Sequence, residues 1–283
     1  MAEIPNVCLS LPSRPENVLV VRQALTGVAE CLDLDGVETN DLTTAVTEAC
    51  NNVVLHAYDG GEGPLEVDVH ALADAVAVVV RDHGRGIDPP MPDEQDEDAR
   101  VGLGLPVIAA LTRDVELRDR DGGGTEVRME FAAAHAAALG LSDGAVPASS
   151  CIQPQSEPAS AISLSLAPNA IVRAVLPRVL SALAARAHFS VDRISDVQIV
   201  ADVLAAKSRE SLSALHLDVG VTVTPRSLEL RLGPLQTGHG ESLLSAAADG
   251  MAPVIERLTD GHHRVESEDS TETLELRLVE HQR

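Results

Sequence analysis

The chain has 283 residues, and its 44 acidic against 21 basic side chains give a formal net charge of −23. This charge argues against nucleic acid or an anionic membrane surface as the main partner, and favours a basic protein surface or a nucleotide carried with Mg²⁺. The length predicts about two domains, and no apolar run approaches the ~18 residues of a membrane span. The N-terminus has no signal-peptide pattern and the four cysteines are scattered without C-x-x-C spacing. We therefore expect a cytoplasmic protein with reduced thiols.

Residues 1–133 predict one α+β domain. Hydrophobic periodicity and turn signals indicate, in chain order, a strand, two helices, a hairpin, a short helix and a second hairpin, at 8–11, 16–32, 41 onward, 65–84, 105–113 and 114–132. A turn-rich break at 33–40 separates the two helices, and Asn40 or Asp41 is the expected cap of the second one. This order predicts an α/β sandwich in which a mixed sheet is covered on one face by helices.

The second half of the chain echoes the first. Residues 134–161 are rich in Ala, Ser and Pro, which predicts an interdomain linker. Residues 162–283 then repeat the order of elements at low identity, and a Thr-Glu pair opens the last strand of each half, at 125–126 and at 271–272. We therefore predict a duplicated architecture.

One helical stretch, TEACNNVVLHAY at residues 47–58, carries a row of polar groups in an apolar setting. Glu48, Asn52 and His56 recur at i, i+4 and i+8, so a continuous α-helix would place them on one face. A solvated helix face is the ordinary explanation of such a row.

Three glycine-rich stretches accompany that helix. Asp82 ends a strand and is followed by Gly84 and Gly86, so its carboxylate can accept a hydrogen bond from an exocyclic amine while the backbone approaches a flat ligand. Gly102 and Gly104 precede a helix, whose free N–H groups suit phosphate. Glycines at 122–124 lead into Thr125 at the start of a strand. Each stretch alone is most often a plain turn, but the set in this order points to a nucleotide site.

The four stretches together resemble the nucleotide-binding boxes of the GHKL superfamily, which includes gyrase, Hsp90, histidine kinase and MutL ATPases. Residues 5–133 look most like the anti-sigma-factor serine protein kinases. The residues that match the N-box, G1 box, G2 box and final Gly-Thr are Glu48, Ala49, Asn52, His56, Ala57, Tyr58, Asp82, Gly84, Gly86, Gly102, Gly104, Gly124 and Thr125. The resemblance implies a Bergerat-type fold that binds ATP and Mg²⁺.

The resemblance also implies roles for the matching residues. Asn52 would give its carboxamide oxygen to Mg²⁺, and Glu48 would act as general base on a serine hydroxyl of a partner protein. Asp82 would read the adenine amine with support from Thr125. Gly102 and Gly104, with a lid at 89–101, would close over the phosphates.

The roles of two residues and one segment have more than one interpretation. His56 could equally hydrogen-bond within the core and position the helix. Arg100 could touch phosphate or a partner, or form a surface ion pair beside the acidic run at 93–98. That run is most simply a solvated loop.

Residues that are absent narrow the class of protein. The only lysine of the chain is Lys207, so the first half lacks the phosphate-binding lysine of a P-loop kinase or a eukaryotic-type protein kinase. In the second half, Val203 and Lys207 stand where the first half has Glu48 and Asn52, and LGPLQTG replaces the G1 box without its Asp. We expect this degenerate GHKL-like domain to have lost nucleotide binding.

The sequence thus predicts an ATP-binding serine protein kinase of the anti-sigma-factor type, acting in transcription regulation. By resemblance its partners are an anti-anti-sigma antagonist, which it phosphorylates, and a sigma factor, which it sequesters. The alternative is a non-catalytic, nucleotide-sensing, protein-binding regulator, and a plain ATPase is a third reading. A homodimer, or a pseudo-dimer of the two halves, is compatible with the sequence.

Overall fold

A computed structural model describes residues 5–72, 74–86, 104–120, 122–133, 161–167, 170–245, 253–267 and 270–281. The chain divides into two compact units, unit 1 (Met1–Ser150) and unit 2 (Cys151–Arg283). Apart from residue 161, the predicted linker lies outside the described residues. None of the helices that the structure describes combines the length and the apolar character of a membrane-crossing segment.

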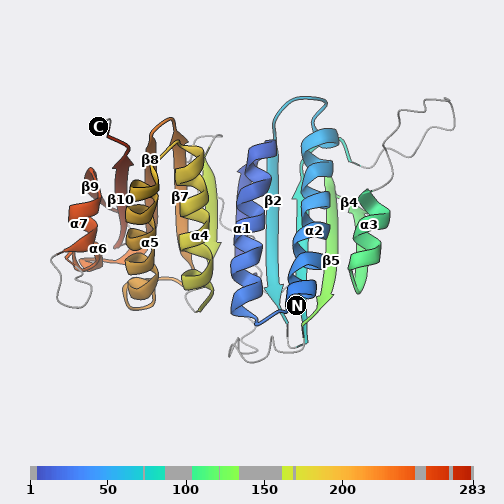
Figure 1. The fold of residues 1–283 in the computed structure, drawn as a ribbon, viewed down its shortest axis with the longest axis horizontal. Helices are drawn as coiled ribbons and strands as arrows, with labels where there is room; N and C mark the ends of the chain where they lie inside the picture. Colours follow the sequence, from blue (N-terminus) through green and yellow to red (C-terminus); the bar gives the residue numbers. More distant parts are fainter. Residues whose placement is uncertain are drawn as a thin grey trace. The chain divides into compact units, whose positions relative to one another are not determined.

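Unit 1 is an α+β sandwich whose helices lie on one face of a sheet (Figure 1). Its elements are β1 (Val7–Pro12), α1 (Pro15–Cys31), α2 (Gly36–Asn52), the π-helical turn η1 (Val53–Ala57), β2 (Pro64–Ala71), β3 (Ala75–Asp82), α3 (Gly104–Leu111), β4 (Asp114–Asp119) and β5 (Thr125–Ala132). The strand order is β4-β5-β3-β2-β1. The predicted fold class is confirmed.

The sheet of unit 1 is antiparallel in each pairing described within the unit, so the expected mixed sheet is wrong. The reason lies in the connections. Two helices, α1 and α2, connect β1 to β2. Because the chain reverses direction at each connection, β2 runs antiparallel to β1. Tight hairpins join β2 to β3 and β4 to β5, which also imposes antiparallel pairing.

The core of unit 1 is aliphatic, as the scarcity of aromatic residues requires. β2 alternates, with Leu65, Val67 and Val69 at most 1% exposed. β3 lies in the middle of the sheet and is buried at nearly every position, which fits its unbroken apolar run. Cys50 is fully buried among these side chains, and burial raises the pKa of its thiol to about 12.

The cysteines agree only in part with the sequence expectation. Cys31 and Cys50 are free thiols. Cys8 of β1 is disulfide-bonded, contrary to the expectation of reduced thiols.

Helix α2 begins earlier than predicted. Its N-cap is Asp35, whose carboxylate accepts hydrogen bonds from the N–H groups of Val37 and Glu38, while the Glu38 carboxylate accepts one from the Asp35 N–H. This reciprocal capping box starts the helix inside the segment expected to be a turn-rich break. The expected caps, Asn40 and Asp41, are therefore internal residues of α2.

Unit 2 has the same order of strands and main helices. Its elements are β6 (Ile162–Leu166), α4 (Ala170–Arg186), α5 (Val191–Ser211), β7 (Leu217–Thr224), β8 (Ser227–Gln236), α6 (His239–Leu244), α7 (Val254–Leu258), β9 (Gly261–Glu266) and β10 (Thr271–Val279). The strand order β6-β7-β8-β10-β9 matches that of unit 1, strand for strand. This agrees with the predicted repeat of architecture, while duplication as its origin stays a prediction.

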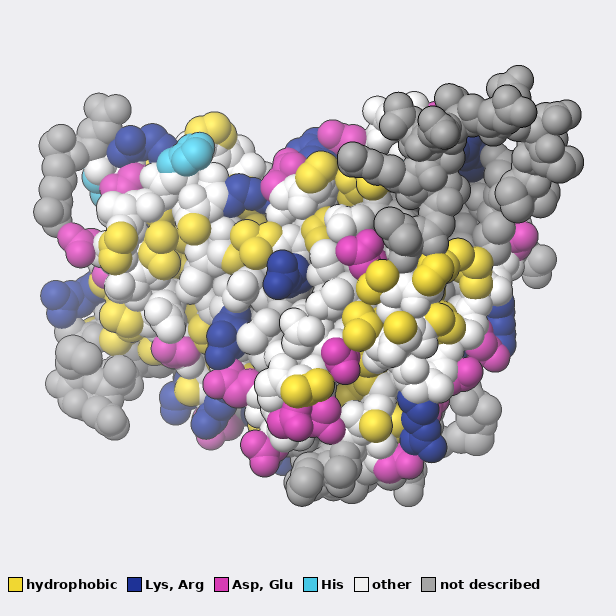
Figure 2. Space-filling view, turned by 45° about the vertical axis from the view of Figure 1, so that its right-hand side comes forward, with side chains coloured by type: hydrophobic (Ala, Val, Ile, Leu, Met, Phe, Trp, Pro, Cys, Tyr) yellow, Lys and Arg dark blue, Asp and Glu magenta, His cyan; other side chains and the backbone are white. Residues whose placement is uncertain are grey.

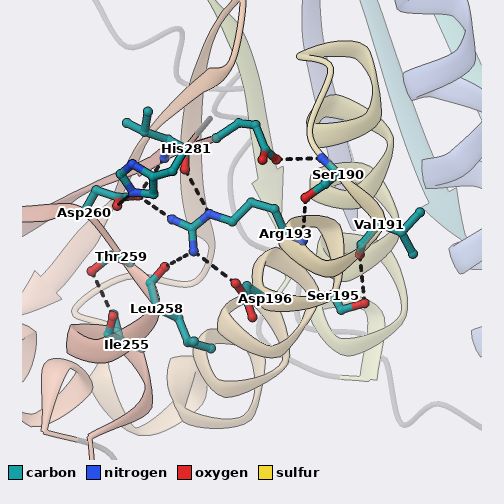
Figure 3. A network of polar contacts seen from close by, with 12 residues as sticks. Ser190, Val191, Arg193, Ser195, Asp196, Ile255, Leu258, Thr259, Asp260 and His281 are labelled. Atoms are coloured by element: carbon teal, nitrogen blue, oxygen red, sulfur yellow. Dashed lines mark hydrogen bonds and ion pairs between the residues drawn. The ribbon is translucent and has the colours of Figure 1, made fainter. Parts of the chain in front are cut away.

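A polar network around Arg193 ties three parts of unit 2 together (Figure 3). The Arg193 guanidinium, on α5, donates a hydrogen bond of 3.0 Å to the Val279 carbonyl oxygen and one of 2.9 Å to the Leu258 carbonyl oxygen. It also forms an ion pair with Asp260. His281 also contacts Asp260. The network fastens the end of β10 and the α7–β9 junction to the first turn of α5.

Candidate functional site

The carboxamide of Asn52 lies at the C-terminal end of α2, directly against Gly104 at the start of α3. A Cβ atom added to Gly104 would lie 3.2 Å from both Oδ1 and Nδ2 of Asn52, which is a tight contact. The predicted N-box asparagine and the second G2 glycine are therefore neighbours, although 52 positions separate them in the sequence. Glu48, one turn before Asn52, is half-buried on the same helix.

His56 does not continue the row formed by Glu48 and Asn52. After Asn52 the α-helix gives way to the π-helical turn η1. Such a turn closes its hydrogen bonds between residues i and i+5, so residues within it, such as His56, leave the line predicted for a 3.6-residue repeat. His56 is exposed, so the reading of it as a core histidine is wrong.

Asp82, at the end of β3, is held rigidly and is only 4% exposed. Its Oδ1 accepts a hydrogen bond of 2.8 Å from the Gly84 N–H. Its carbonyl oxygen accepts another of 2.8 Å from Nη1 of Arg120. Among the described residues, the structure gives the second carboxylate oxygen no hydrogen-bond partner. A buried carboxylate with one oxygen fixed and one to spare is suited to accept a hydrogen bond from a ligand amine.

Glycines surround Asp82 because backbone segments meet there without room for side chains. A Cβ on Gly124, whose φ is +94°, would lie 2.2 Å from the Asp82 carbonyl oxygen, and one on Gly84 would lie 2.1 Å from the carbonyl oxygen of Ala57. Gly86 lies beside Asp119. The G1 box, the end of the N-box and the last glycine turn thus meet at one place in unit 1.

Thr125 is the first residue of β5 and is half-buried. β3 and β5 pair with Arg81 opposite Glu126. The next position of this antiparallel register sets Asp82 opposite Thr125, so the two predicted adenine-site residues are adjacent.

Two further residues, for which the sequence predicts no role, contact the site. Arg120 holds the Asp82 carbonyl group, as described above. Tyr58 has its hydroxyl between β2 and the residue after Asp82, and burial, reinforced by the carboxylates of Asp82 and Glu66, raises the pKa of this hydroxyl. Tyr58 is the single tyrosine in a chain without tryptophan. That was the available signal, since a lone aromatic residue at the end of a motif invites a specific role.

Part of the predicted site lies outside the described residues. This applies to Gly102, to the lid at 89–101 with Arg100, and to the acidic run at 93–98. For these positions the roles stay as predicted from the sequence.

The described residues fit an adenine nucleotide with Mg²⁺. The base would find the spare oxygen of Asp82 within a frame of glycines, and an amide oxygen, the kind of ligand that Mg²⁺ accepts, lies at Asn52. Because Gly104 at the start of α3 has no side chain, it does not cover the Asn52 carboxamide. The assigned roles themselves stay predictions.

The corresponding region of unit 2 is filled by the chain itself. α6 packs against α5, β8 and β10, the counterparts of α2, β3 and β5, and inserts Leu243 and Leu244, at most 4% exposed. The carboxylate of Glu272 accepts hydrogen bonds of 3.0 and 3.1 Å from the N–H groups of Gly238 and Gly240 and is 1% exposed. At the position of Asn52, Lys207 is exposed and pairs with Glu210.

Hydrophobic side chains gather on the right-hand half of the face drawn in Figure 2, where unit 1 turns α3 toward the viewer. The sequence of this helix, GLPVIAAL, is wholly apolar, yet Ile108 is its one buried residue. Leu105 is 45% exposed and follows Gly104, the residue that touches Asn52. The Asn52 end of the site is thus bordered by an apolar surface.

The comparisons with known proteins concern unit 1. Residues 11–131 match the family described as histidine kinase-like ATPase domain. A Bacillus pumilus protein named serine-protein kinase RsbW is 33% identical over 127 residues, which are 40% of this chain and 78% of that protein. Its namesake from Listeria innocua is 37% identical over 122 residues, 39% and 78% of the two chains. A protein of Caldanaerobacter subterraneus subsp. tengcongensis named anti-sigma F factor is 30% identical over 127 residues, 43% and 89% of the two chains.

Proposed function

Through its N-terminal unit this chain belongs to the family of histidine kinase-like ATPase domains, and from that premise we propose that unit 1 is an ATP-dependent protein serine kinase. The observation that carries the proposal is the meeting of four separate sequence stretches in unit 1. The end of α2, the loop after β3, the start of α3 and the turn before β5 bring Asn52 against Gly104 and surround Asp82 with glycines.

Each residue then has one task. The spare carboxylate oxygen of Asp82 accepts a hydrogen bond from the adenine amine, and Thr125 lies beside it. Asn52 supplies an amide oxygen to Mg²⁺, which when bound lowers the negative charge that the attacking oxygen meets at the γ-phosphate. Glu48, one turn along α2, takes the proton of the attacking hydroxyl.

The proposed reaction transfers the γ-phosphoryl group of ATP to a serine hydroxyl. A serine Oγ of the partner protein forms a bond to the γ-phosphorus, and the bond from that phosphorus to the bridging oxygen of ADP breaks. The hydroxyl proton passes to the Glu48 carboxylate. The products are a phosphoserine and ADP, so no oxidant or further reactant is required.

The proposed partners are an anti-anti-sigma antagonist, which carries the serine, and a sigma factor, which the protein binds in alternation. The names of the relatives support this pairing, since they include serine-protein kinases and an anti-sigma factor. The apolar surface of α3 beside Asn52 supplies a place where a partner protein can dock near the phosphate end of the site. The net charge of −23 favours a partner that presents a basic surface.

The test combines the full chain, Mg·ATP with a labelled γ-phosphate, and candidate antagonist domains. We expect transfer of label to a serine, reduced at least about 100-fold in Glu48→Gln because the general base is lost. Nucleotide binding should persist in Glu48→Gln and be lost in Asp82→Ala.

Other outcomes separate the alternatives. Binding of ATP without transfer to any antagonist favours a nucleotide-sensing regulator. Release of inorganic phosphate that depends on Glu48, without a phosphoprotein, favours a plain ATPase. Unchanged nucleotide binding in Asp82→Ala contradicts the assigned site.

A further inference from the structure

The end of the N-box, at Ala57, contacts the loop that follows Asp82 at two positions. The Ala57 carbonyl oxygen accepts a hydrogen bond of 3.2 Å from the Arg85 N–H. Gly84 lies so close to Ala57 that any side chain at position 84 would collide with the Ala57 carbonyl group. The loop that fixes Asp82 is therefore in direct contact with the last residue of η1.

Tyr58, the next residue, completes this attachment through its hydroxyl group. The hydroxyl accepts a hydrogen bond of 2.9 Å from the His83 N–H and donates one of 2.6 Å to the Pro64 carbonyl oxygen. A Cβ on Gly63 would lie 2.2 Å from the Tyr58 ring, so the ring is packed against the Gly63 backbone. The ring and its hydroxyl are held from three sides, which fixes the residue directly after Asp82.

The same segment leads straight back to Asn52. η1 spans Val53–Ala57, so Asn52 immediately precedes this π-helical turn and Tyr58 immediately follows it. A π-helical turn within an α-helix costs regular hydrogen bonding and is frequent at functional sites. In unit 2 the equivalent helix runs without such a turn to Ser211, and no tyrosine stands in that half of the chain.

We propose that Tyr58 is a positioning residue that sets Asp82 relative to Asn52, and that it thereby determines the selectivity of the site for adenine over other purines. This inference rests on the proposed function. Tyr58 touches neither base nor phosphate in this account. It acts on the orientation of Asp82 through its hydrogen bond with the His83 N–H. The turn η1 connects Tyr58 to Asn52, the proposed metal ligand, and so fixes Asp82 relative to Asn52.

The test compares ATP with ITP, whose base carries a carbonyl oxygen where adenine carries its amine. We expect the full-length wild type to bind Mg·ATP at least about tenfold more tightly than Mg·ITP, because Asp82 accepts a hydrogen bond only from the amine. In Tyr58→Phe the ring stays and both hydroxyl contacts vanish. The preference should fall below about threefold, while the unfolding temperature drops by only a few degrees.

Two controls separate positioning from general loosening of the fold. Thr26→Val removes a single side-chain hydrogen bond, to the Arg22 carbonyl oxygen of α1, and should leave the ATP-to-ITP ratio unchanged. Thr259→Val removes a side-chain hydrogen bond in unit 2, to the Ile255 carbonyl oxygen, and should likewise leave the ratio unchanged.

A second measurement serves if Tyr58→Phe does not fold. Replacing the single tyrosine by a ring-fluorinated tyrosine gives one fluorine NMR signal from the intact protein. That signal should shift on addition of Mg·ADP and shift much less with Mg·IDP at equal occupancy.

The outcomes are distinct. A wild type that binds neither nucleotide overturns the proposed function and this inference with it. A wild type that prefers ATP, with a variant that loses affinity for both nucleotides at an unchanged ratio, overturns the inference alone. Equal shifts of the fluorine signal with Mg·ADP and Mg·IDP also overturn the inference alone.

Discussion

The two units share a strand order but differ where α2 and α5 end. In unit 1 the helix stops at Asn52 and continues as η1, whereas in unit 2 α5 runs as one α-helix of 21 residues. The interrupted helix brings Ala57 and Tyr58 onto the loop after β3. The uninterrupted one carries Lys207 into solvent. The same topology therefore produces a candidate site only where the helix is broken at the right residue.

The space between the long helix and the sheet can be followed in unit 2, whereas residues 87–103 of unit 1 lie outside the described part of the chain. Unit 2 places α6 there, with Leu243, Leu244 and the buried carboxylate of Glu272. The Glu272 carboxylate accepts hydrogen bonds from backbone N–H groups at the start of α6. Its counterpart in unit 1, Glu126, instead pairs with Arg81 across the sheet. In unit 2 an internal carboxylate thus satisfies the N–H groups at the start of a short helix.

A further difference concerns how the long helices begin. α2 is started by the local capping box of Asp35 and Glu38. α5 has Ser190 as its cap, and Arg193 replaces the box glutamate and reaches distant carbonyl groups. Where unit 1 has a local contact at this position, unit 2 thus has a network that joins its C-terminal strand.

The largest expected effect comes from giving unit 1 the residue of unit 2. Asn52→Lys should reduce phosphate transfer at least about 100-fold, since even outer-shell partners of a metal ligand are worth 10–100-fold. The reverse change, Lys207→Asn, should create no nucleotide site, because α6 and Glu272 fill the space. Transfer of labelled γ-phosphate measures the first variant, and equilibrium binding of fluorescent ADP measures the second. A second site in Lys207→Asn would contradict the comparison.

The next effect is on the stability of unit 2. Glu272→Ala leaves the N–H groups of Gly238 and Gly240 without their buried acceptor and should lower the free energy of unfolding by about 2–4 kcal/mol. Glu256→Ala, at an exposed position of α7, is the matched control. Denaturant unfolding followed by circular dichroism gives the two values. Nucleotide binding by unit 1 should not change in either variant, and equal stability of the two variants would argue against the sealing role of Glu272.

The Arg193 network should make unit 2 sensitive to acid. Partial burial alone would raise the pKa of Asp260, but hydrogen bonds from His281 and the Val279 N–H, with the charge of Arg193, outweigh it and hold the pKa below its ordinary value. The stabilisation is therefore complete above the unfolded-state pKa of about 3.9 and is lost as the pH falls through the lowered folded-state pKa. Asp260→Asn should be less stable than wild type at neutral pH, and the gap should close as the pH falls through the lowered folded-state pKa of Asp260. A gap that widens on acidification would refute the sign of this linkage.

The smallest effect separates the two helix starts. Asp35→Ala should cost about 1 kcal/mol of stability, the usual value of an N-cap. Ser190→Ala should cost less, because the Arg193 N–H lies 3.3 Å from the Ser190 hydroxyl, a long hydrogen bond, and because the guanidinium network still holds the helix. Unfolding midpoints at neutral pH measure both, and a larger loss in Ser190→Ala would reverse the comparison.

The sequence predicted which residues the structure brings together better than it predicted their setting. Glu48 and Asn52, one turn apart, and the glycines around Asp82 are local patterns that survive without tertiary information. The Asp35 start of α2 was also readable from its Asp-x-x-Glu spacing. By contrast, η1 breaks the 3.6-residue repeat on which the placement of His56 depended. The role of α6 depends on packing between distant strands, which no local window contains.

The central claim, one working nucleotide site in a chain with two units of the same topology, is tested most directly by binding stoichiometry. Calorimetric titration of the full chain with a non-hydrolysable ATP analogue and Mg²⁺ should give one site per chain, which Asp82→Ala removes. Two sites per chain, or one site that persists in Asp82→Ala, would contradict the account.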